Sequence, residues 1–152
     1  MGLNIVLIEP EIPNNTGNIG RLSLASGSTL HLVKPFGFEL TDARVKRAGL
    51  DYWQHVDIKI YENVDDFFAT HSTKKMVFFS SHGTRSVWDI DFEDGMFLVF
   101  GKESVGLSEE ILQANLDALY KIPILSPHIR SLNVANAVSV VVYEGLRQLS
   151  AR

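Results

Sequence analysis

The stretch LVFGKESVGL, residues Leu98–Leu107, carries the chain out of an apolar strand and into a turn with two glycines. The strand is expected to end at Phe100. Gly101 then lets the backbone turn without a Cβ clash, and Glu103 comes just before a second turn at Gly106. Small and polar residues follow a strand end in two later segments, IPI at 122–124 and RSLNVANAVSVVVYE at 130–144. This repeated pattern predicts the walls of one ligand pocket.

Working outward, short apolar runs alternate with helical or turn-rich segments along the whole chain. The predicted strands are 5–8, 30–33, 56–61, 76–80, 97–100 and 119–122. The predicted helices are 19–26, 41–47, 64–71, 108–114 and 133–149. Strands that are apolar throughout are typical of a sheet covered on both faces. The alternation therefore predicts an α/β fold, a mostly parallel sheet with helices on both faces.

Composition narrows the class of protein further. The chain has 152 residues, of which 45% are hydrophobic, so we expect one domain over residues 1–152. It contains no cysteine, and its histidines show no close metal spacing, so no metal site is expected. The first residues form a strand without a basic flank or a long apolar run, which favours a cytoplasmic protein and argues against a membrane partner.

The net charge of −4 argues against nucleic-acid binding by bulk electrostatics, so any such binding must be local. The strongest basic cluster is Arg44, Lys46 and Arg47, with Lys34 nearby. A small cluster of this kind is more often a solvated helix face than a binding site, and the cluster alone favours that interpretation.

The segment PNNTGNIGR, from Pro13 to Arg21, follows the first predicted strand and leads into the helix expected from Ile19. In an open α/β sheet this position lies outside the carboxyl end of a strand, where ligands usually bind. Its amides could point at an anion, with Arg21 on the first turn of the helix, or the segment could be a plain turn and N-cap. It is not the dinucleotide-binding fingerprint.

The polar residues of the last third also have two interpretations each. Glu103 suits a cationic or hydroxyl-bearing ligand, or it ties its loop down by accepting hydrogen bonds from backbone amides. Ser131 or Asn133 is a plausible N-cap of the final helix. Tyr143 on that helix is more often a core or interface residue than a catalytic one.

Taken together, three motifs resemble the signatures of the SPOUT methyltransferases: NTGNI at 15–19 with Arg21, FGxExxGL at 100–107, and IP at 122–123 followed by RSLNVANAVS at 130–139. Four further segments are similar to the TrmL (YibK-like) branch of that superfamily: EPEIP at 9–13, KPFGF at 34–38, RAGLDY at 47–52 and VYExxRQL at 142–149. The match spans nearly the whole chain.

The resemblance implies an S-adenosylmethionine-dependent enzyme that methylates the ribose 2′-hydroxyl of the wobble nucleotide, a cytidine or modified uridine, in the anticodon loop of leucine tRNAs. It also implies a SPOUT-type α/β knot, a trefoil formed by the carboxyl-terminal segment, and a homodimer. Alternatives are a related enzyme acting on another tRNA or rRNA site, or a non-catalytic RNA-binding protein that keeps the knot.

The resemblance further implies roles for individual residues. The expected cofactor-binding residues are Phe79, Gly101, Val105, Leu107, Ile122, Ser131 and Leu132. The expected catalytic residues are Arg21, Asn15, Glu103 and Tyr143. The expected RNA-binding residues are Arg21, Arg44, Lys46 and Arg47. Because arginine stays protonated, Arg21 is expected to grip phosphate and stabilise charge on the ribose oxygen, not to act as a base.

Overall fold

A seven-stranded sheet forms the centre of the computed structural model, which describes residues 2–151 without the side chains of residues 46 and 48–51. The strands are β1 (Asn4–Ile8), β2 (Thr29–Val33), β3 (Ile58–Tyr61), β4 (Met76–Phe79), β5 (Arg85–Ser86), β6 (Phe97–Phe100) and β7 (Leu119–Lys121). Their order is β3-β2-β1-β6-β4-β7-β5, and each neighbouring pair is parallel. The predicted α/β fold is confirmed, with the sheet parallel throughout.

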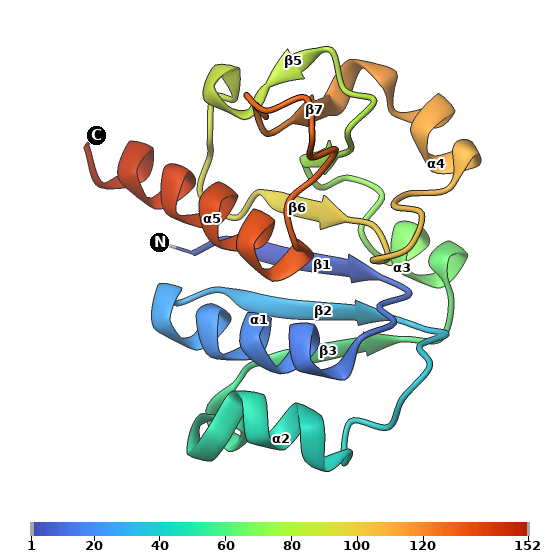
Figure 1. The fold of residues 1–152 in the computed structure, drawn as a ribbon, viewed down its shortest axis with the longest axis vertical. Coiled ribbons are helices and arrows are strands. Elements are labelled where there is room, and N and C mark those ends of the chain that lie inside the picture. Colours follow the sequence, from blue (N-terminus) through green and yellow to red (C-terminus); the bar gives the residue numbers. More distant parts are fainter. Residues whose placement is uncertain (1, 152) are drawn as a thin grey trace.

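Helices cover both faces of this sheet. The α-helices are α1 (Pro13–Ser26), α2 (Ala43–Gly49), α3 (Val64–Thr70), α4 (Glu109–Ala114) and α5 (Val134–Ser150). Short 3₁₀ turns are η1 (Leu50–His55), η2 (Val87–Asp89) and η3 (Leu116–Ala118). In Figure 1, α1 and α5 lie on the near side of the sheet and α3 lies behind it. Helix α2 packs against α1 and lies at the edge of the sheet that β3 forms.

The central strand β1 shows why the core divides into two layers. Successive side chains of a strand point to opposite faces. Ile5 and Leu7 pack in the cluster that includes residues of α1 and α5. Val6 and Ile8 pack in the other cluster, with residues of α3 and α4. All four side chains are at most 3% exposed, so both faces of the sheet are buried.

The strand order also determines where a site forms. Strands β4, β6 and β7 are neighbours, and Phe79 lies level with both Phe100 and Tyr120. Their carboxyl ends therefore lie at one edge of the sheet, next to the start of α1 after β1. Ligands of open α/β sheets bind at this edge, where the strand order changes direction.

Helix α1 begins at Pro13, so the predicted start near Ile19 is wrong, and Arg21 lies in the third turn instead of the first. Proline is well tolerated at the first helical position because its missing N–H has no helical partner there. Gly20, in the segment that could be read as a turn, lies inside α1 and has a packing role: a Cβ there would lie 2.5 Å from Cζ3 of Trp53. The two-residue strand β5 was not predicted, because so short a segment leaves no periodic signal.

A buried chain of hydrogen bonds lies on the α3 face and centres on His31, which is 3% exposed. Asn4 donates from Nδ2 to the carbonyl of Gly95, so its Oδ1 accepts from His31 Nε2 at 2.8 Å. His31 Nδ1 then accepts from the Tyr61 hydroxyl, whose oxygen accepts from His71 Nε2, both at 2.8 Å. Burial is the main cause that lowers the pKa of His31 to about 4.

We expect this histidine to make stability depend on acid. Between pH 6.5 and pH 4 the unfolded chain binds a proton at His31 that the folded chain does not, so the free energy of unfolding falls as the pH falls. The loss is on the order of 3 kcal/mol at pH 4. Urea midpoints of the wild type and His31→Gln, measured from pH 7.5 to pH 4, should show a shallower slope in the variant. Parallel slopes would contradict the assignment.

Candidate active site

A cavity of about 760 Å³ opens at the carboxyl ends of β4, β6 and β7. Its walls come from the 101–106 loop, the 122–124 segment, the 130–134 segment and the first turn of α1. The three segments in which the sequence predicts pocket walls therefore meet at one place. The volume falls in the range of small-molecule and cofactor sites, ~300–1,000 Å³.

The cavity brings together most of the expected cofactor-binding residues. Those that line it are Phe79, Gly101, Val105, Ile122, Ser131 and Leu132. Leu107 is not among the lining residues, because its side chain is 5% exposed and packs in the core cluster that contains residues of α3 and α4. The ring of Phe79 stacks on that of Phe100, with centroids 4.8 Å apart, and both rings form part of the cavity wall.

Gly101 lies where the loop folds back on itself. A Cβ there would be 2.2 Å from the carbonyl carbon of Gly106 and 2.3 Å from the nitrogen of Leu107. The loop is closed by the N–H of Gly106, which donates to the carbonyl of Lys102 at 2.9 Å. Gly106 itself has a φ of 74°, a conformation that favours glycine. Only glycine at position 101 therefore allows this backbone to approach so closely.

The carboxylate of Glu103 faces the start of α1. Its two oxygens accept from the backbone N–H groups of Glu11 and Ile12, each at 2.8 Å, and Oε2 also accepts from Asn15 Nδ2 at 3.2 Å. The N-cap residue Ile12 has no side chain able to accept these bonds. Glu103 thus caps α1 from about 90 positions away, where a negative charge also complements the helix dipole. The amide-binding interpretation of Glu103 is the one observed.

Two contacts return from the α1 side to the same loop. Glu11 Oε1 accepts from the backbone N–H of Ser104 at 2.8 Å, and this hydrogen bond is the main cause that lowers the pKa of Glu11. Lys102 Nζ lies 3.3 Å from Glu9 Oε1. We call the hydrogen bonds that Glu103 and Glu11 accept between the start of α1 and the 101–106 loop the Glu11–Glu103 clasp. It joins the start of α1 to the loop that lines the cavity.

A pair of asparagines extends this network to α5. Asn15 is 7% exposed, and its Oδ1 accepts from Asn133 Nδ2 at 3.1 Å. Asn133 Oδ1 accepts from the backbone N–H groups of Ala135 and Asn136, so Asn133, and not Ser131, is the N-cap of α5. Both asparagines line the cavity. Their fixed amides supply oriented polar groups beside the predicted cofactor pocket.

The remaining expected site residues whose side chains the structure describes do not line the cavity. Arg21 is exposed on α1, with its guanidinium 5.1 Å from the ring centroid of Tyr52. Tyr143 is 49% exposed on α5. Arg44 forms an ion pair with Asp42 at 3.0 Å, and Arg47 is exposed on α2. The side chain of Lys46 lies outside the described residues.

Three cations in the cavity wall, Lys102, Lys121 and Arg130, were not among the expected site residues. Arg130 opens the third motif, so its position was a signal, whereas Lys121 ends a strand of only three residues. No group of three or more His, Cys, Asp or Glu side chains that could hold a metal is found among the described residues.

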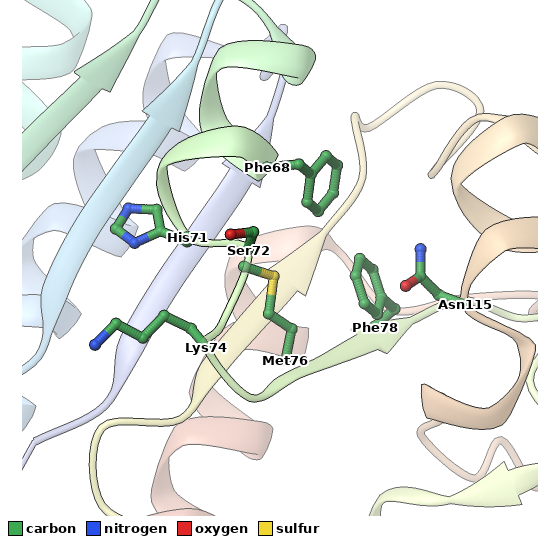
Figure 2. Close-up of a pocket in the computed structure, with 7 residues that line it drawn as sticks. All are labelled: Phe68, His71, Ser72, Lys74, Met76, Phe78 and Asn115. Carbon is green, nitrogen blue, oxygen red and sulfur yellow. The ribbon is translucent and has the colours of Figure 1, made fainter.

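A second, smaller cavity of about 330 Å³ lies between the end of α3, the start of β4 and the end of α4 (Figure 2). Its apolar wall is formed by Phe68, Met76 and Phe78. Figure 2 shows Lys74 extending away from the two phenylalanine rings. No residue of the expected active site lines this cavity, so the two are separate.

This parallel sheet, with a cavity at its carboxyl edge walled by a doubled-back glycine loop, defines the molecule as an α/β protein with a site of cofactor size. The chain belongs to the SpoU rRNA Methylase family, whose sequence profile matches residues 2–143. The resemblance to SPOUT methyltransferases is thereby confirmed.

Relatives with closely similar sequences carry more specific names. The chain is 46% identical over 147 residues to the tRNA (cytidine(34)-2'-O)-methyltransferase of Saccharophagus degradans, covering 96% of this chain and 95% of that protein. It is 45% identical over 148 residues to the protein of the same name from Escherichia coli K12, covering 97% and 94%.

Solved structures agree with this family. One described as giving structural insights into the 2-OH methylation of C/U34 on tRNA has a TM-score of 0.94 and 44% identity, covering 99% of this chain and 98% of that one. An AdoMet-bound rRNA methyltransferase from Sinorhizobium meliloti has a TM-score of 0.88 and 25% identity, covering 97% of this chain and 57% of that one. Among residues 2–151, no helix has the length and apolar character needed to cross a membrane.

Proposed function

We propose that this protein transfers a methyl group from S-adenosylmethionine to the ribose 2′-oxygen of the wobble nucleotide, cytidine or modified uridine, in leucine tRNAs. The observation that carries the proposal is the cavity at the ends of β4, β6 and β7, lined by the residues of all three motifs. The names of the similar proteins from Saccharophagus degradans and Escherichia coli support the same nucleotide.

The residues of the cavity fit S-adenosylmethionine. A flat base needs apolar side chains over its faces and backbone groups at its edge. Phe79, Ile122 and Leu132 supply the apolar surface, and the doubled-back loop at Gly101 brings backbone N–H and C=O groups within reach. The cofactor supplies an electrophilic methyl group on a sulfonium, which is already a good leaving group. The protein then has to align the ribose oxygen with that methyl and exclude competing water.

Asn15 and Asn133 are our proposed aligning residues, because they are fixed to each other and to Glu103 on the cavity wall. Glu103 has both oxygens engaged by α1, so we assign it a positioning role in place of a direct catalytic one.

We assign Arg21 to binding an RNA phosphate and stabilising charge on the reacting oxygen. It lies about 12 Å along α1 from Pro13, at 1.5 Å per residue, and it does not line the cavity of its own chain. We propose that Arg21 acts instead on the cavity of the partner chain in a homodimer. Val140 and Tyr143 are 42% and 49% exposed on one stripe of α5, an apolar surface for a second copy that would bring Arg21 and Tyr143 toward the partner's cavity.

A methyl-transfer assay tests the proposal. The protein is incubated with labelled S-adenosylmethionine and unmodified tRNA from its host, and the label is mapped by nuclease digestion and mass spectrometry. We expect label at the wobble ribose of leucine tRNAs, and a sedimentation coefficient of a dimer in the same preparation. Arg21→Ala should bind the cofactor normally in calorimetry and lose transfer at least 100-fold.

Other outcomes identify the alternatives. Label at another tRNA or rRNA position would indicate a related 2′-O-methyltransferase. RNA binding without cofactor binding would indicate a non-catalytic RNA-binding protein. An Arg21→Ala protein of wild-type activity would refute the role of that residue. The trefoil knot stays a prediction from the resemblance, and a cytoplasmic location stays a prediction from the amino-terminal sequence.

A further inference from the structure

The cavity wall holds more positive charge than its surroundings neutralise. Its ionised side chains at neutral pH are Lys102, Lys121, Arg130 and Glu103. Glu103 is engaged by the start of α1, and Lys102 is paired with Glu9 at 3.3 Å. Lys121 and Arg130 have no carboxylate partner within the described residues.

Cations without a partner are a minority among the lysine and arginine side chains that the structure describes. Half of those side chains are paired with a carboxylate, and Arg21 and Arg85 lie over tyrosine rings. Those with neither contact are Arg47, Lys74, Lys121 and Arg130. Two of these line the same cavity in a protein whose net charge is −4. An anionic ligand is the simplest reason for that concentration of unpaired charge.

Two different strand-end segments deliver these cations. Lys121 is the last residue of β7, and Arg130 belongs to the segment between β7 and α5. Both side chains are exposed to solvent, whereas Phe79 and Phe100 deeper in the cavity are at most 8% exposed. The positive charge therefore lies on the solvent side of the cavity, outside the apolar surface that fits an adenine base.

We propose that Lys121 and Arg130 form a subsite for the phosphodiester backbone of the RNA, gripping the phosphates on either side of the methylated ribose. The inference rests on the proposed function and extends it to residues that bind the substrate. Every ribose within an RNA chain has a phosphate on each side, so the two cations at the solvent side of the cavity match the number of these charges. Arginine binds phosphate through two parallel N–H groups, and lysine binds it as a point charge.

The cofactor offers a rival anion, its single carboxylate. It carries one negative charge against the two positive charges of Lys121 and Arg130, and it belongs to the amino acid end of a ligand whose base fits the inner wall. The two sources of anion also differ in their response to salt. Each phosphate that a cation neutralises releases counterions, which makes RNA binding depend steeply on ionic strength, with a slope near −0.7 per contact for single strands.

The test compares Lys121→Ala and Arg130→Ala with the wild type, using unmodified host tRNA as the probe. Lys74→Ala serves as a matched control, because it removes another unpaired cation at the separate cavity of Figure 2. We expect each cavity variant to weaken tRNA binding about 10-fold at 150 mM salt and to make the slope of log Kd against log salt shallower by about 0.7. The KM for tRNA should rise, while kcat should stay within 3-fold of the wild-type value. Calorimetry should give an unchanged Kd for S-adenosylmethionine.

Weaker cofactor binding with an unchanged tRNA salt slope would overturn the inference and assign these cations to the cofactor carboxylate. Equal effects of Lys74→Ala and Arg130→Ala would overturn it too, since only general charge would then matter. The proposed function fails separately, if the wild type places no methyl group on the wobble ribose. The salt slope is read from binding alone and does not depend on that outcome.

Discussion

Gly101→Ala is expected to weaken the affinity for S-adenosylmethionine at least 100-fold and to lower the thermal midpoint of unfolding. The new Cβ would lie 2.2 Å from the carbonyl carbon and 2.7 Å from the Cα of Gly106, and 2.3 Å from the nitrogen of Leu107. All three are backbone atoms, so no side chain can rotate out of the way. The loop must open, and the backbone groups that we propose for the base edge move with it. A 100-fold loss corresponds to about 2.7 kcal/mol of binding free energy.

Gly37→Ala is the matched control, because a Cβ there meets no atom within 4 Å. It should keep the affinity for S-adenosylmethionine in calorimetry and the thermal midpoint in scanning calorimetry. A Gly101→Ala protein that binds the cofactor with wild-type affinity would show that the close approach of the loop has no part in the site.

A comparison of Gly101 with Gly20 shows which features of the fold could be predicted from the sequence. The role of Gly101 was predictable because a turn that follows an apolar strand has a local signature. The packing of Gly20 against Trp53 was not, because that contact depends on how α1 meets η1. The same limit explains why the start of α1 was predicted too late: the amides of Glu11 and Ile12, just before the helix, are bound by a residue about 90 positions away, and no local capping pattern marks this start.

Long-range contacts account for the other differences within the site. The three motifs meet because β1, β6, β4 and β7 are consecutive in the sheet. Arg21 and Tyr143 lie outside the cavity of the single chain, since they sit well along α1 and α5 from its edge. The free charge of Lys121 and Arg130 was not visible in the sequence, because it depends on which carboxylates lie near each cation.

Glu103→Gln is expected to destabilise the fold by ~2–3 kcal/mol, the cost of hydrogen bonds to a charged group. Both oxygens of Glu103 accept backbone N–H bonds, and Oε2 also accepts from Asn15. A glutamine side chain has one oxygen, so its NH₂ group would face one of the two backbone N–H donors and that hydrogen bond would be lost. The start of α1 would also lose the nearby negative charge that complements the helix dipole. The urea midpoint should fall, and the Kd for S-adenosylmethionine should rise about 10-fold because the clasp no longer holds the loop.

Glu11→Gln is the natural comparison, because Glu11 contacts the loop through one residue, accepting from the backbone N–H of Ser104. Glutamine keeps that acceptor, so the variant should retain nearly all of the stability and cofactor affinity. A direct catalytic role for Glu103 has the opposite signature. It would leave the urea midpoint and the cofactor Kd of Glu103→Gln unchanged, lower kcat more than 100-fold, and remove the acidic limb of the pH-rate profile. Because both oxygens of the Glu103 carboxylate already accept hydrogen bonds from amide N–H groups, we expect the stability and affinity losses instead.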